Sequence, residues 1–84
     1  MKFAMESFDS FTFQMEFDGE RKKVTAKPHP EPLKDGKPIS FEISINNFPR
    51  GKIRLNDNEW HSPDIINEKL VEAIGKHLSD HYNR

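Results

Sequence analysis

Two histidines near the end of the chain have the spacing of a metal-binding pair. His77 and His81 are four residues apart, which places both side chains on one face of a helix. Imidazole nitrogens bind zinc and nickel, but such a site needs a third and usually a fourth ligand. The other polar residues that the fold would have to bring close are His61, His29, Asp80 or Glu16. The alternative, which we favour, is that both rings fill the margin of the core and, when protonated, interact with the negative end of the helix dipole.

Other catalytic signals are missing from the sequence. The chain has no cysteine, which excludes thiolate metal sites, disulfides and a cysteine nucleophile. It also has no nucleophile elbow, glycine-rich phosphate loop, HExxH sequence or EF-hand loop. Glu16 and Glu42 occupy outward positions of alternating segments, where a solvated carboxylate is the ordinary outcome and no acid/base pair is expected. We therefore expect a protein that is not an enzyme and has no cofactor.

Charge and hydropathy exclude further classes of function. The 84 residues carry a net charge of −1 with interleaved signs, so no basic patch for nucleic acid is expected. In the predicted strands the aromatic residues lie on the face opposite to the lysines and are directed toward the helix, which leaves no exposed stacking platform for RNA. No apolar run is long enough to cross a bilayer, and Glu6 and Asp9 lie where a secretion signal would be apolar. The sequence predicts a cytoplasmic protein that binds neither nucleic acid nor membrane.

The segment from Ser62 to Tyr82 predicts the one helix. Its start is indicated by Ser62 as cap, Pro63 at the first position and Asp64 at the positive end of the dipole. At about 100° per residue one face is apolar and the other is charged. The apolar face comprises Ile66, Leu70, Ala73, Ile74 and Leu78, with Val71 and Tyr82 at its edge. This is the pattern of a helix that covers a sheet.

A hairpin is predicted before residue 28. Apolar and polar residues alternate from Phe11 to Phe17, which is typical of a strand with one buried face. Asp18-Gly19 is a strong signal for a two-residue turn. That turn would place Phe13 opposite Val24, so that the apolar residues of both strands share a face. A four-residue loop would keep the same parity and remains an alternative.

A second hairpin is predicted after the proline-rich connection. Prolines at positions 28, 30 and 32 end the preceding strand because they lack an amide donor. Alternation then predicts one strand over 39–45 and another carrying Ile53 and Leu55 inward. Their apolar positions are odd on both strands, so the connecting loop should contain an odd number of residues. Trp60 follows and is expected to close one end of the core.

These elements predict an α+β, two-layer domain. Residues 10–84 would form one ββββα unit, a four-stranded antiparallel sheet of two hairpins with the C-terminal helix on one face. Residues 1–9 have no clear period and are expected to form a flexible tail, with Phe3 and Phe8 free to dock or not. The predicted core includes Phe13, Phe41, Ile43, Trp60, Leu70 and Ile74.

Three segments carry a resemblance to other proteins. They read FTFQMEFDG, GKIRLNDNEW and IGKHLSDHY, and the resemblance extends over most of the chain from Phe11 onward. In these segments the chain resembles small, uncharacterised single-domain bacterial proteins of ββββα type. The resemblance implies the fold and no known activity.

The predicted sheet is wider than its cover. Four strands about 4.8 Å apart span roughly 19 Å, whereas a helix covers about 10 to 12 Å. Sheet twist, a docked tail or loop, or a protein partner or homodimer could cover the remaining apolar surface. Phe48-Pro49 at a loop tip is a second candidate contact. We therefore expect a non-catalytic protein-interaction or accessory module, with a small-ligand or divalent-metal protein using His77 and His81 as the alternative.

Overall fold

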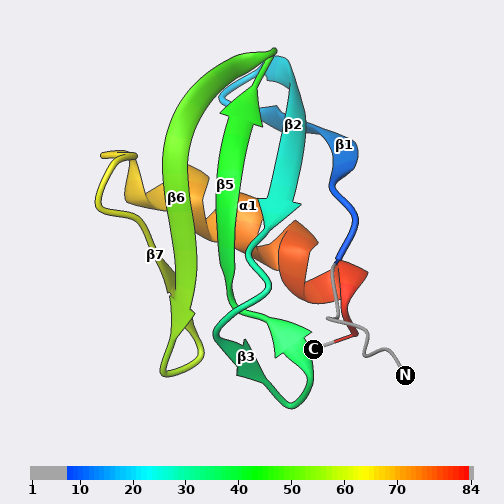
Figure 1. Cartoon of the computed structure of the whole chain (residues 1–84). Coiled ribbons are helices and arrows are strands. Elements are labelled where there is room, and N and C mark those ends of the chain that lie inside the picture. Colours follow the sequence, from blue (N-terminus) through cyan, green and yellow to red (C-terminus); the bar gives the residue numbers. More distant parts are fainter. Residues whose placement is uncertain (1–7, 84) are drawn as a thin grey trace.

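The computed structural model describes residues 8–83 as a curled antiparallel sheet with one helix across its concave side (Figure 1). The main sheet has five strands in the order β1-β2-β5-β6-β7, and a separate two-stranded sheet pairs β3 with β4. The strands are β1 (Phe11–Phe17), β2 (Glu20–Pro28), β3 (Leu33–Lys34), β4 (Lys37–Pro38), β5 (Ser40–Ile45), β6 (Phe48–Asn56) and β7 (Glu59–His61). The helix α1 comprises Glu68–His81. The α+β class and the C-terminal cover helix are thus as predicted, but the four-stranded sheet is wrong, because the main sheet has five strands and curls into a half-barrel.

The first hairpin has the predicted register. Phe17 lies opposite Glu20 and Phe13 opposite Val24. Asp18 and Gly19 form the two-residue turn with φ of 54° and 76°, the left-handed conformation that such turns require at both positions. The apolar side chains of β1 and β2 therefore share the concave face.

The second hairpin differs from the prediction at its loop. Asn46 and Asn47 form a two-residue turn with φ of 52° and 71°, so the odd-numbered loop is wrong. The register instead shifts within the strands, because Ser44 lies opposite Pro49 whereas Ile43 lies opposite Gly51. The extra residue of this β-bulge restores the parity that brings the apolar side chains of β5 and β6 to one face.

The additional strand β7 comes from a third turn, at Asp57-Asn58. Both residues have positive φ, 54° and 66°, and they join β6 to β7 with Leu55 opposite Trp60. A fourth such turn, Asp35-Gly36, closes the β3-β4 hairpin within the expected proline-rich connection. Alternation over three residues is too short to predict β7 from the sequence.

The helix begins five residues later than predicted. Ser62 Oγ accepts the amides of Asp64 and Ile65, at 3.1 and 2.9 Å, but this turn does not continue as helix. Asn67 is the true cap, and its Oδ1 accepts the amides of Lys69 and Leu70, both at 3.1 Å. Asp64 instead accepts the Lys52 amide through Oδ2 at 2.9 Å, which ties the segment to β6 and delays the helix.

Because the helix starts later than predicted, one predicted core residue is replaced by its neighbour. Ile66 was predicted to face the sheet, but it is 93% exposed, whereas Ile65 is 4% exposed and joins the core. The predicted core residues Phe41, Ile43, Leu70 and Ile74 are buried, and Phe13 and Trp60 are half-buried against them. The core therefore lies between the concave sheet face and α1.

Curling of the sheet covers much of the apolar surface that a single helix would leave exposed on a flat sheet. The sheet bends around α1, and the helix crosses behind its strands (Figure 1). Phe8, within the expected tail, packs edge-on against Tyr82 with ring centroids 6.4 Å apart; Phe3 lies outside the described residues. Within residues 8–83 no helix has the length and apolar character needed to cross a membrane.

Candidate functional site

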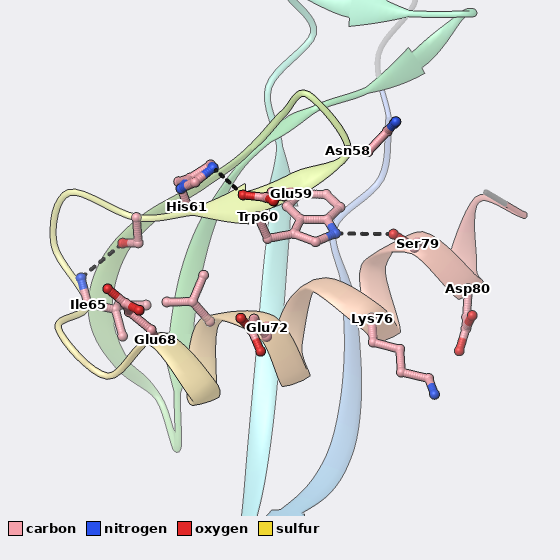
Figure 2. Close-up of a pocket in the computed structure, with 12 residues that line it drawn as sticks. Asn58, Glu59, Trp60, His61, Ile65, Glu68, Glu72, Lys76, Ser79 and Asp80 are labelled. Carbon is pink, nitrogen blue, oxygen red and sulfur yellow. Dashed lines mark hydrogen bonds and ion pairs between the residues drawn. The ribbon is translucent and has the colours of Figure 1, made fainter.

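An open groove runs along the junction of the edge strand β7 and α1 (Figure 2). Its volume is about 680 Å³. One wall is the segment from Asn58 to Ser62, and the other is the helix face that carries Glu68, Glu72 and Lys76. These helix positions are four residues apart, so they form one row along the groove. Two smaller hollows, of about 440 and 320 Å³, lie elsewhere on the described residues.

Trp60 links the two walls of the groove. Figure 2 shows the indole reaching from β7 to α1, where Nε1 donates a hydrogen bond to Ser79 Oγ at 3.1 Å. The ring also lies 5.9 Å from that of Phe41 in the core. The indole therefore fixes β7 to the helix and leaves its outer part within the groove.

The backbone of Trp60 faces the open side of β7. Leu55 donates its amide to the Ile39 carbonyl at 2.8 Å, so the Leu55 backbone is directed toward β5. Backbone direction alternates along a strand, so Arg54 and Asn56 bond to β7, at His61 and Glu59. The N–H and C=O of Trp60 therefore point away from β6, where a further strand could pair with them.

The groove has an excess of negative charge. The carboxylates are those of Glu59, Glu68, Glu72 and Asp80, and the single lysine is Lys76. His61 also lines the groove, and its Nε2 lies 3.7 Å from Glu59 Oε1. A positively charged ligand would therefore be attracted to this face.

His77 and His81 lie on the other side of α1, against β1. The His81 ring stacks on Phe11 with centroids 3.6 Å apart, and the His77 ring stacks on Phe13 at 4.5 Å. The two histidines share a shallow hollow of about 320 Å³ with Asp80 and Thr12. Each ring thus covers a phenylalanine of the edge strand.

The structure does not assemble a metal site around this pair. Residues 8–83 contain no group of three histidine or carboxylate side chains arranged to hold an ion. Of the expected additional ligands only Asp80 lines the same hollow. His29 instead contacts Glu42 at 3.4 Å, and His61 lies in the groove beside β7.

Phe48 and Pro49, the predicted contact, lie at the start of β6 beside the Asn46-Asn47 turn. Phe48 is 69% exposed, so it does not pack over the hairpin end. Neither residue lines the groove beside β7. They form an isolated apolar tip.

No pattern in the sequence predicts the acidic groove. The four-residue spacing of Glu68, Glu72 and Lys76 was visible, but it is equally typical of a solvated helix face. Asp57-Asn58 was the available signal for an extra strand, because such pairs favour two-residue turns. Without β7 there is no second wall and hence no groove.

Comparison of the chain with protein-family models, with curated proteins and with solved structures gave no match.

Proposed function

We propose that this protein is a non-catalytic interaction module that binds a positively charged, extended segment of another protein in the groove between β7 and α1. The observation that carries the proposal is the open acidic groove beside an edge strand whose central backbone groups face outward. Addition of a strand to an exposed sheet edge is a common mode of peptide recognition.

The dimensions of the groove suit a short segment. From Glu68 to Asp80 the helix wall rises by about 18 Å, at about 1.5 Å per residue. An extended chain rises about 3.3 Å per residue, so five or six residues would span the wall. Lysine or arginine side chains at alternate positions would face Glu68 and Glu72, and the main chain would bond to Trp60.

A titration followed by tryptophan fluorescence tests this function. Trp60 is the only tryptophan in the chain and lines the groove. A seven-residue peptide of alternating valine and lysine should shift its emission, with an affinity that falls as salt rises. The matched valine and glutamate peptide should not bind.

Charge variants locate the binding surface. Glu68→Gln with Glu72→Gln should weaken binding of the lysine peptide about tenfold, since two attractive carboxylates are lost. Asp9→Asn with Glu31→Gln removes the same charge from exposed residues outside the groove and should have little effect. Equal binding of both peptides, or equal effects of both double variants, would contradict the proposal.

A further inference from the structure

The opposite edge of the sheet, β1, also has backbone groups that no other strand of residues 8–83 pairs with. Lys23 and Asn46 bond to each other, since the Asn46 amide donates to the Lys23 carbonyl at 2.8 Å and Asn46 Oδ1 accepts the Lys23 amide at 3.0 Å. The Lys23 backbone is thus directed toward β5, and its neighbours on β2 bond to β1 at Phe13 and Met15. By alternation, the N–H and C=O groups of Thr12, Gln14 and Glu16 point away from β2.

Within residues 8–83 this edge has little of the usual protection against strand pairing, with Glu16 as its one charged side chain. Among the described residues β1 pairs with β2 alone. Natural edge strands are commonly protected by lysine, proline, a bulge or short length. β1 is seven residues long, contains no lysine or proline, and its pairing with β2 has no register shift. Six backbone hydrogen-bonding groups are therefore available along a regular strand.

The concave side of β1 is incompletely covered. Met15 is buried, but Phe11, Phe13 and Phe17 are only half-buried. Beside Phe11 and Phe13 lies the hollow of about 320 Å³ that His77 and His81 also line. Apolar side chains of an added strand would continue this face of the sheet.

We infer that β1 pairs with β1 of a second copy of this chain, antiparallel and about a two-fold axis at Gln14. This surface is distinct from the groove, at the other edge of the sheet. In this register Gln14 lies opposite Gln14 of the second copy, and Thr12 opposite Glu16 of the second copy. All six outward backbone groups on each strand then pair, in the arrangement of directly bonded antiparallel residues.

The side chains favour a second copy as the occupant. On the concave side Phe11 lies opposite Phe17 of the second copy, whose ring would extend over the hollow beside His81. Phe13 lies opposite Met15 of the second copy, so aromatic and apolar residues meet. The one charged side chain of the strand, Glu16, faces a neutral threonine, and the chain's net charge of −1 gives little repulsion between copies.

Charge exchange at the two-fold axis tests this register. Gln14 is exposed, so Gln14→Lys and Gln14→Glu leave the core unchanged. In sedimentation equilibrium the original chain should dimerise, and each variant alone should dimerise at least about tenfold more weakly, because like charges lie directly opposite. An equimolar mixture of the two variants should recover the dimer as a mixed species.

A matched control and a second variant complete the test. Asn56→Lys and Asn56→Glu change an exposed residue of β6 and should leave dimerisation unchanged. Gln14→Pro removes an amide that faces away from β2, so it should abolish the dimer while thermal unfolding stays cooperative. This variant tests the inference even if the charge variants fold poorly. A monomeric original chain, a dimer that survives both charge variants, or a mixture that stays monomeric would each overturn the inference. Failure here would leave the groove proposal standing, since the peptide titration does not involve β1.

Discussion

The indole of Trp60 packs directly on the backbone of Gly75, and its Nε1 donates to Ser79 one helical turn further on. A β-carbon placed on Gly75 would overlap Cγ and Cδ1 of the indole. Glycine in a helix interior is otherwise unfavourable by about 1 kcal/mol relative to alanine. Glycine at position 75 is thus the poorer helix former, but it leaves the space that lets the edge strand β7 lie against α1.

We therefore predict that Gly75→Ala destabilises the protein although alanine is the better helix former. Overpacking costs about 1 to 3 kcal/mol in a packed interior. The added methyl group would overlap the indole atoms nearest the Trp60 backbone, where a small side-chain rotation does not remove the overlap. The free energy of unfolding in urea should fall by about 1 to 2 kcal/mol. The neighbouring exposed change Lys76→Ala should shift it by less than about 0.5 kcal/mol. A stabilised Gly75→Ala protein would show that Trp60 can move without penalty.

Apolar periodicity predicted the helix but not its first residue. Ser62-Pro63-Asp64 has the composition of a helix start, and Ser62 does cap a turn. The outcome depends on Asp64, whose carboxylate binds the Lys52 amide. That contact spans 12 residues, so no local pattern contains it.

Substitution of the two caps distinguishes their roles. Asn67→Ala should lower the free energy of unfolding by about 1 kcal/mol, because two helix amides lose their acceptor. Asn67→Asp, which keeps an oxygen at the same place, should change it by only a few tenths. Circular dichroism of Ser62→Ala should show unchanged helix content. A larger loss of helix for Ser62→Ala than for Asn67→Ala would restore Ser62 as the helix cap.

Turn residues were the most informative local signal in this chain. Asp-Gly at 18 and 19 fixed the first register, as predicted. At the second hairpin, parity correctly required one extra residue, but the β-bulge at Arg50, between Pro49 and Gly51, supplied it rather than the loop. The parity of the apolar positions shows that one extra residue is needed, but it does not show whether that residue lies in the loop or within a strand.

The conformation of Asn47 gives a direct test of the second turn. Its φ of 71° is in the left-handed region, which costs an ordinary side chain about 1 to 2 kcal/mol and which asparagine tolerates. Asn47→Ala should therefore lower the free energy of unfolding by about 1 kcal/mol, whereas Asn47→Gly should not lower it. Asn56→Ala, an asparagine within β6, is the control for loss of the amide side chain. Equal losses for alanine and glycine at position 47 would argue against the two-residue turn.

The candidate sites were harder to predict than the fold, because each depends on which elements become neighbours. The histidine pair was visible as a spacing, and helix geometry does place both rings on one face. The spacing does not predict which residues face the two rings. In the structure these are Phe11 and Phe13 of β1. The groove requires β7, a strand of three residues that no periodicity could establish.

The stacked histidines lead to a prediction about metal ions. Because His77 and His81 lie on phenylalanine rings and residues 8–83 provide no third ligand group, zinc or nickel at modest excess should leave the melting temperature unchanged. An ion that binds only the folded state would raise it, by mass action. His77→Gln should be compared with His29→Gln, which changes a histidine beside Glu42 on the far side of the sheet. A rise in melting temperature with metal that His77→Gln removes and His29→Gln keeps would show that the pair binds metal, with a ligand supplied from elsewhere.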